Sequence, residues 1–134
     1  MSKLARRAWP KLRHQIGRRG AFLGFLAFLD YVYAWAFWQI PGQPTLGPQI
    51  AWAVAWLVTA MACTVGIFLR KDRMPYTIAS SAKTAYAAQF CYLWITRNVA
   101  YGWVSTVFWF VFALIVLMVS SWPDPVFTDA VGRR

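Results

Sequence analysis

The stretch from Phe22 to Ile40 reads "FLGFLAFLDYVYAWAFWQI" and decides the fold of the chain. It is almost wholly apolar and aromatic, and a helix of about 20 such residues is long enough to cross the hydrocarbon core of a bilayer. Asp30 interrupts it near the middle. Because a charge in lipid is costly, it usually faces the interior of a helix bundle. The stretch therefore predicts a membrane-spanning helix at about 20–40 and a polar partner for Asp30.

The composition favours the same environment for the whole chain. Of 134 residues, 60% are hydrophobic and 13% are charged, whereas soluble domains average about a quarter charged. Fourteen Lys and Arg outnumber four Asp, giving a net charge of +10, and seven of these cations lie before residue 20. This placement predicts a cytoplasmic N-terminus at the cytoplasmic (inner) membrane, with anionic headgroups as the partner and no nucleic acid.

Three further segments complete the predicted all-α bundle. Apolar runs at about 48–69 and 101–121 are long enough to span. Between them, a helix over 75–96 is long enough only if Lys83 lies inside it. Two topologies therefore stay open: four transmembrane helices in two hairpins, or three spans plus an interfacial helix at 74–98. We favour four spans, which place both termini in the cytoplasm.

The flanking segments are short and polar. Residues 1–19 form a basic cytoplasmic or interfacial segment, residues 20–121 the transmembrane bundle and residues 122–134 a short polar tail. The first apolar run ends in "FWQIPGQP", which lacks the small residues of a signal-peptide cleavage site, so we expect a retained helix. Cations beside the spans are expected to anchor the cytoplasmic side: Arg18, Arg19, Arg70, Lys71 and Arg73.

The two intramembrane charges are predicted to meet. Asp30 lies nine residues beyond Ala21 and Lys83 eight beyond Pro75, which places them about 13 Å and 12 Å along two helices that run in the same direction. We therefore expect a buried Asp30–Lys83 pair. Its structural interpretation is that it fixes which helices are neighbours, and its functional interpretation is a proton or ion relay.

Small and aromatic residues indicate how the helices pack. Small residues four apart allow close helix contact in lipid, and we expect this role for Gly20, Gly24, Ala51, Ala55, Ala62 and Gly66, with a small face at Ser81, Ala85 and Ala88. Aromatic residues are typical of membrane interfaces. The expected outer belt is Trp35, Trp38, Trp94, Tyr101 and Trp103, and the inner one is Tyr76 and Trp122.

Motifs of catalysis and metal binding do not occur in the sequence. It contains no G-x-S-x-G, H-E-x-x-H or phosphate-binding loop, and Cys63 and Cys91 lack metal-ligand spacing. We therefore expect no enzyme activity, no catalytic residue, no metal and no cofactor.

Three segments, "RRGAFLGFLAFLDYVYA", "FLRKDRMPYTIASSAKTAY" and "GWVSTVFWFVFALIVLMVSSWPDP", resemble small four-helix membrane proteins of tailed phages of actinobacteria. The residues that carry the resemblance are Arg18, Arg19, Gly20, Asp30, Arg70, Asp72, Arg73, Lys83, Gly102, Trp103 and Trp122–Pro125. The resemblance implies a phage context and a lysis-associated, holin-like role through self-association. The alternative is a structural, accessory or host-modulating membrane protein without enzyme activity.

Overall fold

The computed structural model describes residues 18–68 and 73–122, and this part of the chain forms four α-helices. Their bounds are Arg18–Gln39 (α2), Gln49–Gly66 (α3), Arg73–Arg97 (α4) and Gly102–Ser120 (α5). Within the described ranges there is no strand, which confirms the predicted all-α class. Each end lies within three residues of the helix expected from the apolar runs.

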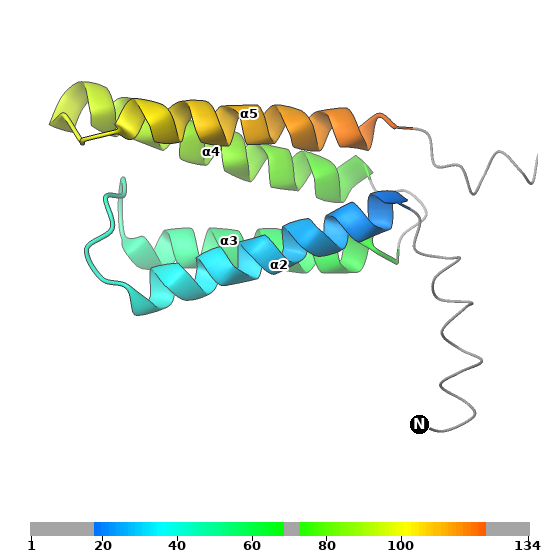
Figure 1. Ribbon diagram of the computed structural model, residues 1–134. Coiled ribbons are helices and arrows are strands. Elements are labelled where there is room, and N and C mark those ends of the chain that lie inside the picture. The colour runs from blue at the N-terminus through cyan, green and yellow to red at the C-terminus, as the bar shows by residue number, and fades with distance from the viewer. Residues whose placement is uncertain (1–17, 69–72, 123–134) are drawn as a thin grey trace, which may run out of the picture.

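The helices pack as two neighbouring pairs. Figure 1 shows α2 beside α3, and α4 beside α5. The axes of all four helices lie along roughly the same line, and the chain direction alternates from one helix to the next. The pairs meet mainly where α4 lies against α3, with a smaller contact between α4 and α2. The beginning of α2 and the end of α5 lie at the same end of the bundle (Figure 1).

Short connections separate the helices. Pro48 precedes α3 with extended backbone angles, which suits a proline because it has no N–H to donate to a preceding turn. In the 40–48 connection, Gly42 and Gly47 have φ angles of 83° and 81°, a region open to glycine without a steric penalty. Asn98 and Tyr101 also have positive φ in the tight turn between α4 and α5. These connections let consecutive helices run antiparallel.

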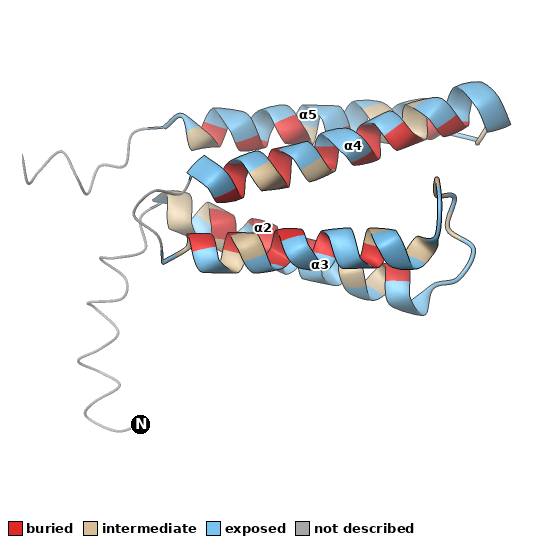
Figure 2. Ribbon diagram, turned by 180° about the vertical axis from the view of Figure 1, so that it is seen from behind, coloured by how far each residue is buried: buried red, intermediate tan, exposed pale blue. Residues whose placement is uncertain are grey.

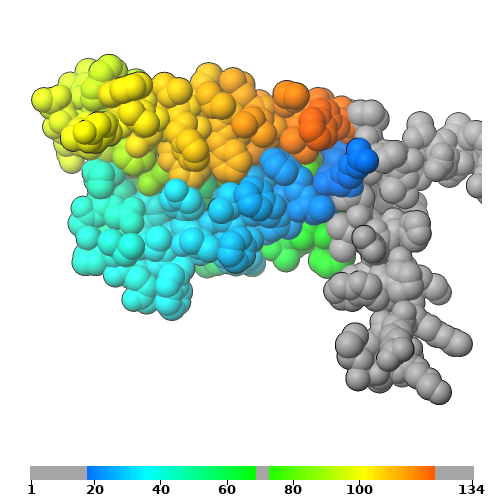
Figure 3. All heavy atoms as spheres, viewed as in Figure 1, coloured from blue at the N-terminus to red at the C-terminus, as the bar shows by residue number. Residues whose placement is uncertain are grey.

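The interior consists of two clusters of buried side chains along the bundle. One contains Leu23, Leu26, Ala27, Cys63, Tyr76, Ala79, Val116 and Val119. The other is mainly aromatic and contains Phe37, Ala53, Trp56, Tyr86, Ala87 and Trp109. Figure 2 shows the buried residues as stripes on the facing sides of the helices. Figure 3 shows side chains of α2 meeting those of α5, so the bundle is closed on that face.

The outer surface of this bundle is apolar. Large side chains such as Phe28, Trp35 and Phe108 are more than half exposed, and many others resemble them. A surface of this kind is unfavourable in water and is solvated by lipid chains in a bilayer. Three helices, α2, α3 and α5, are long and apolar enough to cross a membrane. The length and composition of these three helices support the predicted membrane location.

Candidate functional site: a buried charge pair

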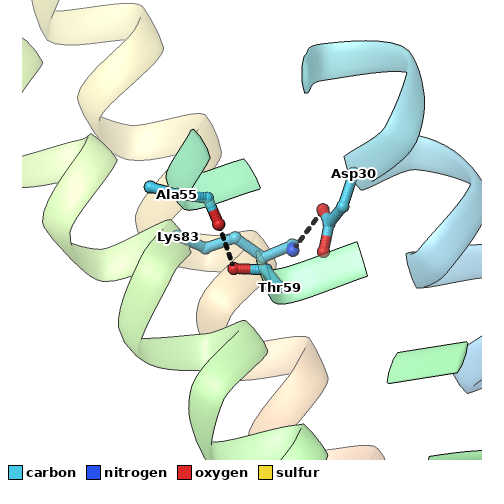
Figure 4. A network of polar contacts seen from close by, with 4 residues as sticks. All are labelled: Asp30, Ala55, Thr59 and Lys83. Atoms are coloured by element: carbon cyan, nitrogen blue, oxygen red, sulfur yellow. Dashed lines mark hydrogen bonds and ion pairs between the residues drawn. The ribbon is translucent and has the colours of Figure 1, made fainter. Parts of the chain in front are cut away.

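The centre of the bundle holds the ion pair that the helix depths predict. Asp30 lies midway along α2 and Lys83 midway along α4, and their side chains are 1% and 0% exposed. The Lys83 ammonium Nζ donates a hydrogen bond to the Asp30 carboxylate Oδ1 at 2.8 Å. Figure 4 shows the two side chains pointing toward each other across the space between their helices.

The remaining helices also contribute to this centre. The Lys83 Nζ lies 5.2 Å from the centre of the Trp56 ring on α3 and 5.5 Å from that of the Phe112 ring on α5. A cation over an aromatic face is attracted by the ring quadrupole, and the attraction is larger where water is excluded. The ammonium of Lys83 therefore connects α4 to a group on each of the other three helices.

Some buried polar atoms at and beside the charge pair have no hydrogen-bond partner. Among the described residues, the Asp30 Oδ2 and the neighbouring Trp56 Nε1 are buried without a hydrogen-bond partner. Thr59 lies beside the pair, but its hydroxyl donates to the Ala55 carbonyl at 2.9 Å instead (Figure 4). A buried polar group without a partner costs about 1–3 kcal/mol. The centre of the bundle is therefore less well satisfied than a purely apolar core.

The arrangement holds charge but does not form a line of proton carriers. A relay needs successive exchangeable groups, and the nearby hydroxyls of Thr59 and Ser80 donate to the backbone carbonyls of Ala55 and Ala113. The geometry consequently favours the structural interpretation of the pair, in which Asp30 and Lys83 fix α2 beside α4.

Two more polar contacts join α4 to α2 and to the connection between α2 and α3, and neither was predicted from the sequence. The Tyr76 hydroxyl donates to the Arg19 carbonyl at 2.8 Å, and the Leu46 backbone N–H donates to the Gln89 Oε1 at 2.8 Å. Tyr76, Lys83 and Gln89 are all buried. Tyr76 and Lys83, seven residues apart, share one face of α4, whereas Gln89, six residues further on, lies about 120° around the helix from Lys83. We call these three residues and their partners the polar seam.

The role of Tyr76 corrects one prediction. The sequence places Tyr76 in an aromatic belt facing the inner interface, but the side chain is 0% exposed and packs inside the bundle. It has this position because it lies on the same face of α4 as Lys83. Trp122 and the five aromatic residues of the expected outer belt are exposed.

The small residues fall into two groups. Gly66 is buried where α3 ends against the first turn of α4, and a Cβ there would lie 2.5 Å from the Pro75 Cγ. At Gly24, the nearest atom to such a Cβ would be at 3.7 Å, an ordinary contact. Gly20 and Ala62 are half-buried. Close packing within the bundle therefore depends on Gly66 more than on Gly24.

Ala51 and Ala55 lie on the outside of the bundle. Both are exposed, and they line a shallow hollow of about 370 Å³ together with Ala82 and Ala85 of α4. Trp52, Trp56 and Leu46 complete its lining. These alanines do not bring helices together within one chain, although they leave room for close approach from outside.

The expected cytoplasmic anchor is described only in part. Arg18 and Arg73, the first residues of α2 and α4, are exposed, and the guanidinium of Arg19 lies 5.5 Å from the centre of the Tyr76 ring. Arg70 and Lys71 lie outside the described residues, as do most of the basic segment 1–19 and of the tail 122–134.

No metal centre is evident in the described ranges 18–68 and 73–122, where His, Cys, Asp and Glu do not gather in groups of three. Comparisons with protein-family models, curated proteins and solved structures find no match for this chain. The arrangement of its own residues is therefore the basis for a functional proposal.

Proposed function

We propose that the chain crosses the cytoplasmic membrane four times, with α4 as the additional span and both termini in the cytoplasm. The 25 residues of α4 extend about 37 Å, which exceeds the thickness of the hydrocarbon core. Its polar residues Ser80, Lys83 and Gln89 lower its apolar character, but all three are buried. Polar residues within spans typically face the bundle interior in this way.

The exposed side of α4 supports the same topology. The hydroxyls of Thr77, Thr84 and Thr96 each donate to the carbonyl four residues earlier, at 2.7–3.0 Å. Threonine bonded back to its own helix presents mainly its methyl group outward, which lipid tolerates. The beginning of α2 and the end of α5 lie at one end of the bundle, which agrees with an even number of crossings.

We propose further that copies of this bundle self-associate and, at high density, make the membrane leaky, as in a holin-like, lysis-associated protein of a phage. The observation that carries this proposal is an apolar outer surface around a centre in which buried polar atoms lack hydrogen-bond partners. The exposed Ala51 and Ala55 allow close contact between copies, because small side chains let helix backbones approach. The resemblance to small actinobacterial phage proteins supports the same role.

A second candidate is a structural or accessory membrane protein that stays closed. The observation that favours it is the closed interior, in which Asp30 and Lys83 are both almost fully buried. In this role the chain would be a stable component for a partner or for the host membrane. It would leave the membrane potential unchanged.

Induced expression in an actinobacterial host, with a potential-sensitive dye and viability counts, separates the two candidates. The leak proposal expects abrupt depolarisation above a threshold amount of protein in the membrane. Ala55→Phe should raise that threshold by filling the outer hollow, whereas Val58→Phe, on the exposed side of the same helix, should leave it unchanged. Unchanged potential at high membrane levels would remove the leak proposal in favour of the accessory role.

A further inference from the structure

Buried polar atoms that lack partners lie in the polar seam and in Trp56, which packs against the Lys83 ammonium. Among the described residues, Asp30 Oδ2 on α2, Trp56 Nε1 on α3 and Gln89 Nε2 on α4 are all buried without a hydrogen bond. Each belongs to a residue that is at most 2% exposed. The three atoms come from three helices, and each residue makes a contact between α4 and the first two helices or their connection: Asp30 with Lys83, Trp56 with Tyr86 and Gln89 with Leu46.

The contacts across this junction differ from those within each pair. The seam is held by three hydrogen bonds of 2.8 Å, formed by Tyr76, Lys83 and Gln89 over about 20 Å of α4. The Lys83 ammonium donates one N–H to Asp30, and it lies near two aromatic rings, which accept no conventional hydrogen bond from its other N–H groups. Water would satisfy the remaining donors and acceptors better than the closed packing does.

The geometry points to the polar seam as the place where water enters the bundle, so that the leak runs within each chain between α4 and the first helix pair. This inference deepens the proposed leak by naming its path and the species that follow it, namely water and small ions. The rival path lies between copies, along the outer hollow at Ala55 and Ala85.

Cys63 is a native reporter of the seam. It is 0% exposed and packs among side chains that include Leu26 and Ala27 of α2 and Tyr76 and Ala79 of α4. A charged methanethiosulfonate cannot cross lipid and reacts with thiolates in contact with water. Its reaction with Cys63 forms a mixed disulfide and releases the sulfinate, so labelling reports water at that position.

The experiment compares three single-cysteine proteins in membrane vesicles of both orientations, below and above the depolarisation threshold. Cys91→Ala keeps Cys63 as the sole thiol. Ala85→Cys and Leu114→Cys, each combined with Cys63→Ala and Cys91→Ala, report the outer hollow and the lipid-facing side of α5. Above the threshold we expect Cys63 to react about ten-fold or more faster than either control.

The outcomes separate the path from the function. Labelling of Ala85→Cys with Cys63 unreactive would overturn the seam path, and so would depolarisation with neither position labelled. An unreactive Cys63 at every level of protein would also overturn it, whatever the potential does. Labelling of Cys63 without depolarisation would show that water enters at the seam but would remove the leak function.

A second variant tests whether polar groups admit the water. Asp30→Ala with Lys83→Met removes both charges from the centre of the seam. This double variant should slow the labelling of Cys63 by about ten-fold, because an apolar seam excludes water. Labelling at the unchanged rate, in a protein that still folds, would contradict a role for the pair in hydrating the seam.

Discussion

Removing both charges from the centre of the bundle should destabilise the chain by less than the sum of the two single removals. The Lys83 Nζ and Asp30 Oδ1 are 2.8 Å apart, a separation at which opposite charges attract by about 6 kcal/mol at an effective dielectric of about 20. Desolvation of both groups offsets much of this attraction. Breaking a buried pair from one side typically costs about 3–5 kcal/mol, because the remaining charge stays buried without its partner.

The change is a double-mutant cycle on the intact chain. Asp30→Ala leaves a buried ammonium and Lys83→Met leaves a buried carboxylate, so each should lower the free energy of unfolding by about 3–5 kcal/mol. In the double variant neither charge remains. We expect its loss to be smaller than the sum of the single losses by about 3 kcal/mol.

Unfolding of purified protein in mixed detergent micelles, with increasing denaturing detergent, measures these free energies. The nine tryptophans of the chain, among them Trp56 beside the Lys83 ammonium, provide the fluorescence signal. Ser81→Ala, on the exposed side of α4, is the matched control and should combine additively with Asp30→Ala. Additivity of Asp30→Ala and Lys83→Met within about 0.5 kcal/mol would refute the pairing.

The other contacts give smaller effects, two of them measured in the same assay and one by hydrogen exchange. Gly66→Ala should lower the free energy of unfolding by about 1–3 kcal/mol, because its Cβ would lie 2.5 Å from the Pro75 Cγ. Gly24→Ala should be near neutral, and equal effects of the two changes would contradict the close contact at Gly66. Tyr76→Phe should lose about 1 kcal/mol with its hydrogen bond to the Arg19 carbonyl, and the exposed Tyr101→Phe should lose none. Gln89→Leu should speed hydrogen exchange at the Leu46 amide, and an unchanged rate would show that the bond of 2.8 Å does not protect it.

The helices and the meeting of Asp30 with Lys83 follow from simple features of the sequence. Long apolar runs mark the helices, and depth along two helices of the same direction depends only on residue counts. The two charges then meet because neither has a comparable partner inside its own run. This part of the structure is set by the cost of a charge in lipid, which overrides finer details of packing.

The rotation of each helix about its axis was harder to predict. Ala51 and Ala55 have the same spacing as Ala62 and Gly66, yet only the second two lie at least partly inside the bundle. Likewise Tyr76 is a residue type that is common at membrane interfaces, but it lies on the buried face of α4. These orientations depend on side-chain packing between helices that are distant in sequence. Residue type and spacing do not contain that information.

The central claim is that α4 crosses the membrane because its polar residues face inward. The most direct test fuses a reporter that is active only outside the cytoplasm after Arg134, with the same reporter after Gly42 as the positive control. Four spans predict activity at Gly42 and none at Arg134, even though both fusions accumulate in the membrane. Strong activity at Arg134 would contradict the claim, because it would leave α4 on the membrane surface and only α2, α3 and α5 as spans.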